Sequence, residues 1–270
     1  MPTKLLHTVA AAALLLSFAA CSADVEGCTD PIARNFNAEA DADCCCEYYQ
    51  VQLQCRHFAR DTAEALQLGG AFFDPQGNAL RADALQLLLS DIQLIDYDGI
   101  AFPIEDSLLF DLRDGAQLRL PNDARALTPE SVRLKMGKFS RTGDYAALRL
   151  HVGLSTSAAN IDATALPSAT HPLASTASPV FWDSTQQRYN SYLFAFYDAQ
   201  RDTTYTLTDS SRISVDIPVE ISVRDGADIT VNIDISYMQM LYNVDLLLDS
   251  PATLRSKIAD NLRQRVFSLR

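Results

Sequence analysis

The sequence predicts an all-β protein, an antiparallel β-sandwich that ends in one helix and follows a small leader rich in cysteine and aspartate. Residues 212–237 alternate apolar and mostly polar side chains on both sides of Asp225-Gly226, the pattern of a β-hairpin with one buried face. From residue 48 onward, short apolar segments are separated by Gly-, Pro- and Asp-containing turns. Apolar residues recur convincingly at helical spacing over residues 250–266 alone, which places the single helix at the end.

Composition restricts the class of partner. Apolar residues make up 48% of the 270-residue chain, which is enough for a sizeable core. The 34 acidic residues outnumber the 22 basic ones and give a formal net charge of −12. Nucleic acid and anionic lipid surfaces both require clustered Lys and Arg, so we expect neither as a partner. An acidic surface favours solubility and cations instead.

Residues 1–20 have the features of a signal peptide, with an apolar segment too short to cross a bilayer as a mature helix. The sequence FAAC at positions 18–21 resembles a bacterial lipobox, with Phe where Leu is usual. This resemblance implies cleavage before Cys21 and lipidation of its thiol, and therefore an outer-membrane lipoprotein facing the periplasm or the cell surface. The following Asp24 and Glu26 resemble the surface-export signal of Bacteroidota lipoproteins. The alternative is an ordinary secretory signal cut nearby.

Residues 21–47 form the leader. Hard oxygen ligands at close spacing favour Ca²⁺, and the leader offers Asp30, Asn35, Asn37, Asp41 and Asp43. Residues 27–48 resemble the GCTDPxAxNYNxxAxxDDGSC repeat of Bacteroidota surface proteins, although DCCCE replaces DDGSC. The leader is therefore either a calcium-binding unit or a disulfide-closed linker. With Cys21 acylated, five cysteines remain, so at least one thiol is free or paired between chains.

Residues 48–270 form the predicted sandwich domain. Candidate strands cover residues 49–57, 85–96, 100–104, 108–112, 132–139, 145–154, 192–196 and 205–208, in addition to the hairpin. Pro218 predicts that its strand lies at a sheet edge or carries a bulge. Residues 155–180 form a long loop rich in Ser, Ala, Thr and Pro, and such loops are usually functional or disordered. Ser250 is a suitable cap for the helix, and Pro251 suits its first position.

The residues that could carry chemistry are few. The sequence contains no GxSxG, HExxH, phosphate-binding glycine loop or paired zinc CxxC motif, so we do not expect an enzyme. His57, His151, His171 and Trp182 remain. Imidazole is a favoured ligand of Cu, Zn, Ni and Fe. Three of these residues also have an ordinary interpretation: His57 as a hydrogen-bonded core or edge histidine, His151 as a solvent-facing one, and Trp182 as a core or rim aromatic.

Several blocks in order resemble the MbnP-like family, the copper-binding proteins of the methanobactin-operon type. The blocks are residues 53–58, LLLSDIQLIDYDG at 87–99, 145–154, Asn160-Ile161-Asp162, HPL at 171–173, SPVFWDSTQQRYNSY at 178–192, and 245–267. The resemblance implies a β-sandwich that holds one copper ion through histidines. It also implies a tryptophan that a partner, an MbnH-like di-haem peroxidase-like protein, oxidises to kynurenine.

Carried over to this chain, the resemblance assigns His171 to the family's HPL position and Trp182 to the first tryptophan of its WSW motif. Ser184 stands where the second tryptophan would be. His57, near the end of the opening strand, is the second expected ligand, and His151 is a spare candidate without a family counterpart. We therefore expect a membrane-anchored, non-enzymatic copper-binding protein.

The alternative is a surface β-sandwich lipoprotein that binds a macromolecule or glycan without copper. Its contact surface would draw on an aromatic set formed by Tyr189, Tyr192, Phe194, Phe196 and Tyr197.

Overall fold

A computed structural model describes residues 24–59, 65–166, 168, 171–174, 181–224 and 228–270. The predicted signal peptide and Cys21 lie outside the described residues. The chain divides into two compact units, Met1–Tyr48 and Tyr49–Arg270, and each is described by itself. Among the described residues, no helix is long and apolar enough to cross a membrane.

The first unit is a small loop structure closed by a disulfide bond. Its two strands, β1 (Glu26–Gly27) and β2 (Ala42–Asp43), pair in parallel. A disulfide joins Cys28 to Cys46, and Cys28 is fully buried. Because so few residues cannot bury enough apolar surface to hold a fold, a covalent link supplies much of the constraint.

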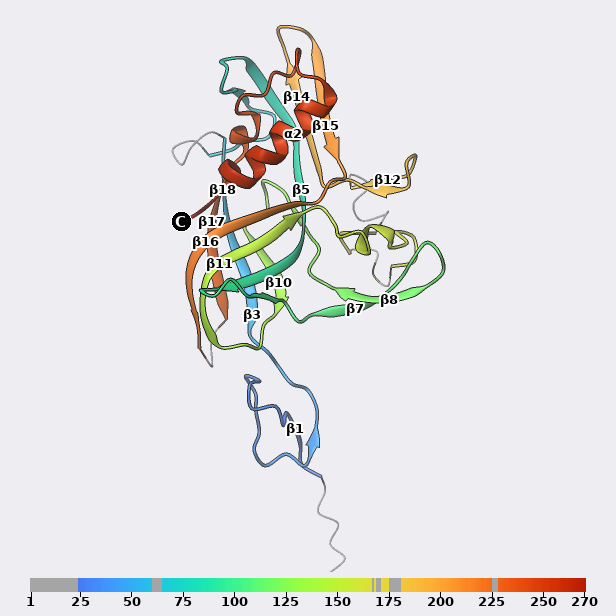
Figure 1. Ribbon diagram of the computed structural model, residues 1–270, viewed down its shortest axis with the longest axis vertical. Coiled ribbons are helices and arrows are strands. Elements are labelled where there is room, and N and C mark those ends of the chain that lie inside the picture. Colours follow the sequence, from blue (N-terminus) through green and yellow to red (C-terminus); the bar gives the residue numbers. More distant parts are fainter. Residues whose placement is uncertain (1–23, 60–64, 167, 169–170, 175–180, 225–227) are drawn as a thin grey trace, which may run out of the picture. The chain divides into compact units, whose positions relative to one another are not determined.

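The second unit is a β-sandwich of two sheets, which confirms the predicted fold class (Figure 1). The smaller sheet has the order β10-β3-β17-β18, and the larger sheet has the order β15-β14-β5-β11-β16, with β4, β6 and β9 also pairing with β5. The bounds of these strands are β3 (Gln50–Phe58), β4 (Ala71–Phe73), β5 (Ala79–Asp96), β6 (Ala101–Pro103), β9 (Arg125–Leu127), β10 (Arg133–Lys138), β11 (Gly143–Val152), β14 (Tyr192–Asp198), β15 (Thr203–Asp209), β16 (Ile213–Val223), β17 (Ile229–Ser236) and β18 (Phe267–Leu269).

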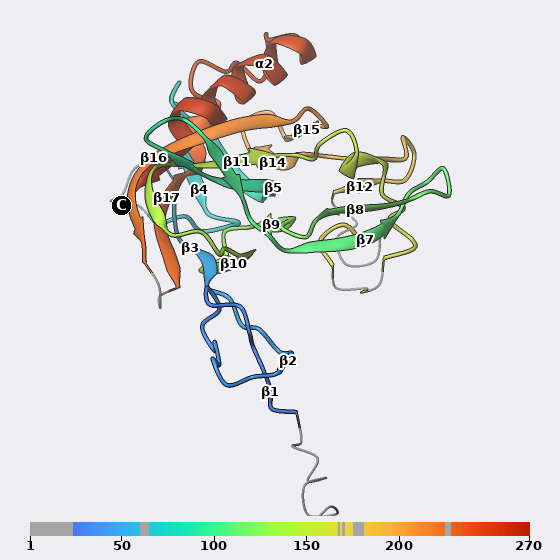
Figure 2. The same ribbon diagram turned by 60° about the horizontal axis from the view of Figure 1, so that its bottom comes forward.

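Two short hairpins and a 3-10 turn lie on one side of this unit (Figures 1 and 2). The hairpins pair β7 (Ser107–Asp111) with β8 (Gln117–Pro121), and β12 (Trp182–Asp183) with β13 (Arg188–Tyr189). The 3-10 turn is η1 (Ala158–Asn160). The side chains of these segments meet in a small apolar cluster, separate from the main core between the two sheets.

The alternating segment 212–237 does form two strands, but the predicted β-hairpin is wrong. β16 pairs with β11 in the larger sheet, whereas β17 pairs with β3 and β18 in the smaller one. Alternation reveals that each strand has one buried face, yet it does not specify the partner strand. Both strands bury that face in the same core from opposite sheets. The expectation for Pro218 is confirmed, because β16 ends the strand order of its sheet.

The central strand β5 is buried on both faces. Leu87 and Leu89 point into the main core, whereas Leu88 between them belongs to the small cluster with Phe110 and Phe181. All three leucines have no exposed surface. The small cluster therefore sits on the outer face of the larger sheet, where one side of β5 would otherwise face water. Its buried members are Leu88, Phe110, Ala124, Leu154, Ile161, Ala163, Leu173, Phe181 and Tyr189.

The predicted C-terminal helix is confirmed as α2 (Pro251–Asn261). The Ser250 hydroxyl accepts a hydrogen bond from Thr253 N–H, and Pro251 takes the first position. A π-helical turn, η3 (Leu262–Val266), continues α2 into β18, and a 3-10 turn, η2 (Tyr237–Leu241), follows β17. Ile258, Leu262 and Val266 are buried in the main core.

Gly153 follows β11 in a conformation that only glycine adopts easily, with φ of 96°. A Cβ at this position would collide with Ser191 Oγ and would lie 2.9 Å from Ser211 O. We expect Gly153→Ala to lower the free energy of unfolding by roughly 3 kcal/mol, because strain and a steric clash add together.

The matched control is Gly115→Ala, where φ is 83° and an added Cβ would meet nothing within 4 Å. Strain alone should cost about 1 kcal/mol there. Denaturant unfolding of both variants measures the difference. Equal losses would show that the approach of Ser191 has no energetic consequence.

Candidate functional site

His171 opens a tight turn beside the small cluster. Its ring lies edge-on to Phe110, with centroids 5.7 Å apart. Leu173 N–H donates to His171 Nδ1 at 3.2 Å, and His171 Nε2 lies 3.1 Å from Asn122 Oδ1. Because Nδ1 accepts, the ring proton is on Nε2 and is donated to the Asn122 amide oxygen. These two contacts define one neutral tautomer of His171.

The surroundings of His171 keep it uncharged. Burial, supported by the nearby positive charge of Arg125, lowers the pKa of His171 from 6.5 to about 4. Neutral imidazole is the form that ligates metal ions. The ring is therefore in its metal-binding protonation state at neutral pH.

Trp182 belongs to the same cluster as the His171 turn. Its ring packs on Tyr189 with centroids 4.9 Å apart. The Tyr189 hydroxyl donates to Leu173 O at 2.7 Å. Trp182 also contacts Arg113, whose guanidinium carbon lies 5.8 Å from the Trp182 ring centroid. Tyr189 thus connects the tryptophan to the turn that carries His171.

His57 lies on β3 in the smaller sheet, and both of its ring nitrogens have partners. Nε2 is 2.7 Å from Ser131 O, and Nδ1 is 3.0 Å from Tyr237 Oη. A carbonyl can only accept, so Nε2–H donates to it and Nδ1 accepts from the Tyr237 hydroxyl. Tyr237 has no exposed surface and stacks on the His57 ring at 5.8 Å. The ordinary interpretation of His57, a hydrogen-bonded histidine, fits these contacts.

His151 is buried, with 7% of its surface exposed, which contradicts a solvent-facing position. It lies on β11 opposite Ser90 on one side and Ser214 on the other. Alternation along the strand could not reveal that neighbouring strands and charged side chains cover this face. Nδ1 lies 3.2 Å from Asp91 O, so Nδ1–H donates to that carbonyl. The lone pair of Nε2 is therefore on the nitrogen that does not bond to Asp91 O. Histidines in metal sites have the same arrangement, in which one ring nitrogen donates to a carbonyl and the other binds the metal.

A buried polar segment connects His171 with His151. Asn122 accepts from His171, and the next residue, Asp123, accepts from Ile92 N–H at 2.6 Å and from the backbone of Asp91. Asp91 in turn holds His151 through its carbonyl. Sequence patterns gave no signal for this role of Asn122 and Asp123, because isolated polar residues between two short strands are typical of any loop.

Arg125 and burial set the charge state of this segment. Arg125 donates to Asn122 O at 3.2 Å and to Ala124 O at 2.7 Å. Burial raises the pKa of Asp123, which is 3% exposed, while its backbone donors act in the opposite direction. Hydrogen bonds to the side chains of Asn122 and Asp123 and to the backbone of Asn122 therefore hold this polar segment in place.

The histidines do not form a ready three-ligand site. Within the described ranges, the one group of three His, Cys, Asp or Glu side chains close enough to share an ion is Cys28, Asp43 and Cys46. Cys28 and Cys46 are joined by the disulfide, so neither sulfur is a thiolate. In the structure, His171 and Trp182 both pack against the small cluster, whereas His57 is half-buried on β3 of the smaller sheet.

The predicted calcium ligands of the leader are used mostly in local hydrogen bonds. Asp30 accepts from Ile32 N–H and the Tyr48 hydroxyl. Asn35 bridges Cys45 O and Glu47 N–H. Asn37 caps Glu39 N–H, and Asp43 accepts from Thr29. Asp41 is exposed. The calcium site stays a prediction, because these contacts describe a folded loop without a cluster of carboxylates.

The family of this chain follows from its fold and from a comparison with known proteins. The fold is an all-β sandwich, and the family model for MbnP matches residues 48–255. This chain therefore belongs to the MbnP family, which is linked to methanobactin and copper.

One solved structure with significant similarity is MbnP from Methylosinus trichosporium, with 13% sequence identity over 74% of this chain and 79% of that chain and a TM-score of 0.45. None of the curated proteins matches significantly.

The lowered pKa of His171 leads to a test by pH. Between about pH 6.5 and pH 4, the unfolded chain binds a proton at this residue that the folded chain does not. The contribution of His171 to stability is therefore complete above about pH 6.5 and is lost as the pH falls toward 4. The imidazole Cε1–H resonance should report a neutral ring at pH 5.5, with the signal assigned by its absence in His171→Gln.

The same variant should also show a weaker dependence of unfolding free energy on pH in that window. The burial of His57 and His151 lowers their pKa values as well, so part of the pH dependence should persist in the variant. Titration of the His171 signal near pH 6.5 would contradict the buried, neutral ring.

Proposed function

We propose that this MbnP-family protein is an extracytoplasmic copper-binding protein with His171 as a ligand and Trp182 beside the metal. The observation that carries the proposal is that a neutral histidine and the chain's one tryptophan pack against the same apolar cluster, His171 through Phe110 and Trp182 through Tyr189. Membership of a copper-linked family supports the choice of metal.

The donor set fits copper better than a structural zinc ion. Structural zinc sites use four protein ligands, and no such group occurs around the histidines among the described residues. Imidazole suits copper, and two imidazoles are enough for Cu(I) at low coordination. When bound, copper would give this site a soft, redox-active metal ion. Asn122 would hold the Nε2–H of His171 and so orient the ring, as outer hydrogen-bond partners do for metal-ligating histidines. The Nδ1 of His171 would exchange its hydrogen bond from Leu173 N–H for the metal.

The second histidine is either His57 or His151, and the hydrogen bonds favour His151. His57 would have to give up its bond to Ser131 O or to Tyr237 before it could offer a lone pair. His151 has Nδ1 held by Asp91 O, which directs the Nε2 lone pair outward from that bond. His151 also connects to His171 through the segment that contains Asn122 and Asp123.

The proposal also covers the location of the protein in the cell and its partners. Lipidation at Cys21 would anchor the protein to the outer membrane, and the protein would bind copper without catalysing a reaction. An MbnH-like di-haem protein is the proposed partner, and Trp182, which is partly exposed, would be its target.

The alternative, a copper-free surface that binds a macromolecule or glycan, loses four of its five proposed contact residues and keeps only the half-buried Tyr197. Tyr189, Tyr192, Phe194 and Phe196 are at most 4% exposed.

Copper content distinguishes these assignments. The purified chain should bind one Cu(I), and His171→Ala should weaken binding at least tenfold, since the loss of one ligand removes a metal–nitrogen bond. His151→Ala should have a similar effect, whereas His57→Ala should retain copper and lose stability because it leaves Tyr237 without its partner. Competition with a chromophoric Cu(I) chelator measures all three.

Trp182→Phe is the control for an aromatic neighbour that does not ligate, and it should retain one copper. No copper above background in the unmodified chain would refute the proposal. Loss of copper in His57→Ala with retention in His151→Ala would instead assign the second ligand to His57.

A further inference from the structure

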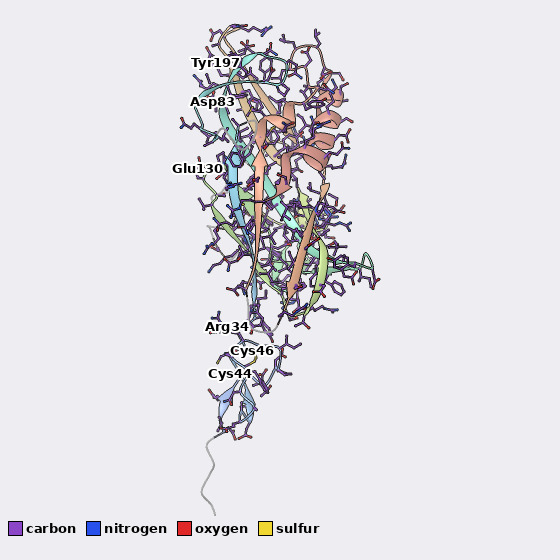
Figure 3. The ribbon with its side chains drawn as sticks, turned by 90° about the vertical axis from the view of Figure 1, so that its left-hand side faces the viewer. Arg34, Cys44, Cys46, Asp83, Glu130 and Tyr197 are labelled. Atoms are coloured by element: carbon purple, nitrogen blue, oxygen red, sulfur yellow. A yellow bond between two sulfur atoms is a disulfide. The ribbon has the colours of Figure 1, made fainter. Side chains whose placement is uncertain are left out.

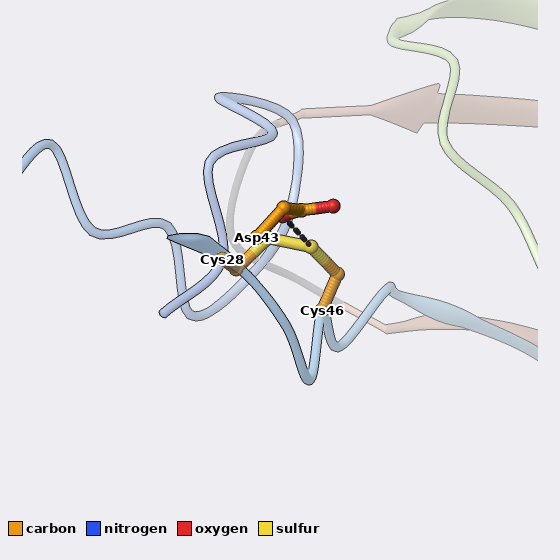
Figure 4. A group of neighbouring side chains, drawn as sticks. All are labelled: Cys28, Asp43 and Cys46. Atoms are coloured by element: carbon orange, nitrogen blue, oxygen red, sulfur yellow. Dashed lines mark hydrogen bonds between the residues drawn. A yellow bond between two sulfur atoms is a disulfide. The ribbon is translucent and has the colours of Figure 1, made fainter. Parts of the chain in front are cut away.

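The disulfide of the first unit lies next to a carboxylate. Cys46 Sγ is 3.5 Å from Asp43 Oδ1 (Figure 4). A disulfide sulfur carries no proton, so this contact is not a hydrogen bond that holds the pair together. One ligand atom from each of Cys28, Asp43 and Cys46 lies within 4.8 Å of the other two.

Asp43 is oriented by contacts of its own. Thr29 donates to Asp43 Oδ1 through both its backbone N–H and its hydroxyl, each at 3.0 Å. These two hydrogen bonds lower the pKa of Asp43, so the side chain is a carboxylate at neutral pH. Carboxylates that ligate metal ions are oriented by hydrogen bonds, and Thr29 orients Asp43 in this way independently of the sulfur atoms.

In addition to the disulfide, hydrogen bonds to the backbone constrain the segments that carry the two cysteines. Asn37 N–H donates to Cys28 O at 2.8 Å, and Cys44 N–H donates to Gly27 O at 3.0 Å. On the other side, Asn35 accepts from Glu47 N–H at 2.8 Å and donates to Cys45 O at 2.7 Å, which brackets Cys46. None of these hydrogen bonds involves a sulfur atom, so reduction of the S–S bond would leave the backbone around both cysteines constrained.

We propose that the first unit is a redox-gated site for a thiophilic divalent ion such as Zn²⁺, formed by Cys28, Cys46 and Asp43 once the disulfide is reduced. A dithiol reductant supplies two electrons and two protons and becomes a disulfide, while the Cys28–Cys46 bond breaks to give two thiols. The ion then displaces both thiol protons and binds two thiolates and one carboxylate. Thiolate and carboxylate are both zinc ligands, and three protein ligands leave one position for water.

The other thiols among the described residues do not belong to this set. Figure 3 shows Cys44 next to Cys46 in the first unit. Neither Cys44 nor Cys45 belongs to the group of ligand atoms that lie within 4.8 Å of one another. Cys55 is buried in the other unit, where burial raises its pKa to about 12. The thiols of Cys44, Cys45 and Cys55 therefore provide controls for the two disulfide-bonded cysteines.

The test compares the detergent-solubilised full chain before and after reduction by a phosphine that is removed under nitrogen. The reduced chain should bind one additional Zn²⁺, and Co²⁺ should give a thiolate-to-metal charge-transfer band. Cys28→Ser and Cys46→Ser should abolish both signals. Asp43→Asn should weaken Zn²⁺ binding about tenfold while the oxidised protein keeps its disulfide and fold.

Two controls separate this site from other sources of binding. The Cys44→Ser/Cys45→Ser double variant should bind Zn²⁺ as the unmodified reduced chain does. His171→Ala should also leave Zn²⁺ binding unchanged, so failure of the copper proposal and failure of this one are distinguishable. Equal Zn²⁺ uptake by the oxidised and reduced chains would overturn the proposal, as would unchanged binding in Asp43→Asn.

Discussion

The burial of β5 on both faces is the constraint on which the second unit depends. A strand in a sandwich normally buries one face and leaves the other to water, and the inner face of β5 follows this rule through Leu87 and Leu89. Leu88 points the other way and also has no exposed surface. The outer face therefore needs a cover, which the β7–β8 hairpin, η1 and the β12–β13 hairpin provide. The residues that cover it are the same residues that bring His171 and Trp182 together.

One of the register irregularities of β5 connects this cover to the sheet. The register between β5 and β11 shifts between the pairs Arg149↔Gln93 and His151↔Ser90, so β5 carries one extra residue there. Asp91 has φ of 48°, and Asp123 accepts from the backbone at this bulge. Bulges re-aim side chains and polar groups next to functional sites. Here the bulge directs Asp91 O toward His151 and joins β5 to the segment that holds His171.

The sequence predicted the strands more reliably than their pairing. Alternation along residues 212–237 identified the buried faces of β16 and β17, because the period of a strand is local information. It could not reveal that the two strands belong to different sheets, which depends on contacts with β11 and β3 far away in the chain. The helix was predictable because Ser250 and Pro251 act within one turn. Family resemblance led to His171 and Trp182, whereas Asn122 and Asp123 depend on tertiary contacts that no local pattern records.

The pairing of β3 with β17 joins two segments that lie about as far apart in the sequence as this unit allows. β3 is the first strand of the unit, and its parallel partner β17 ends at Ser236. Closing so long a loop costs entropy before any contact between the strands can offset it, so sandwiches of this kind fold slowly. As the chain is synthesised, the smaller sheet cannot assemble until almost the whole unit has been made. The topology thus leaves the opening strand β3 without its partner β17 for most of the time that the chain takes to emerge.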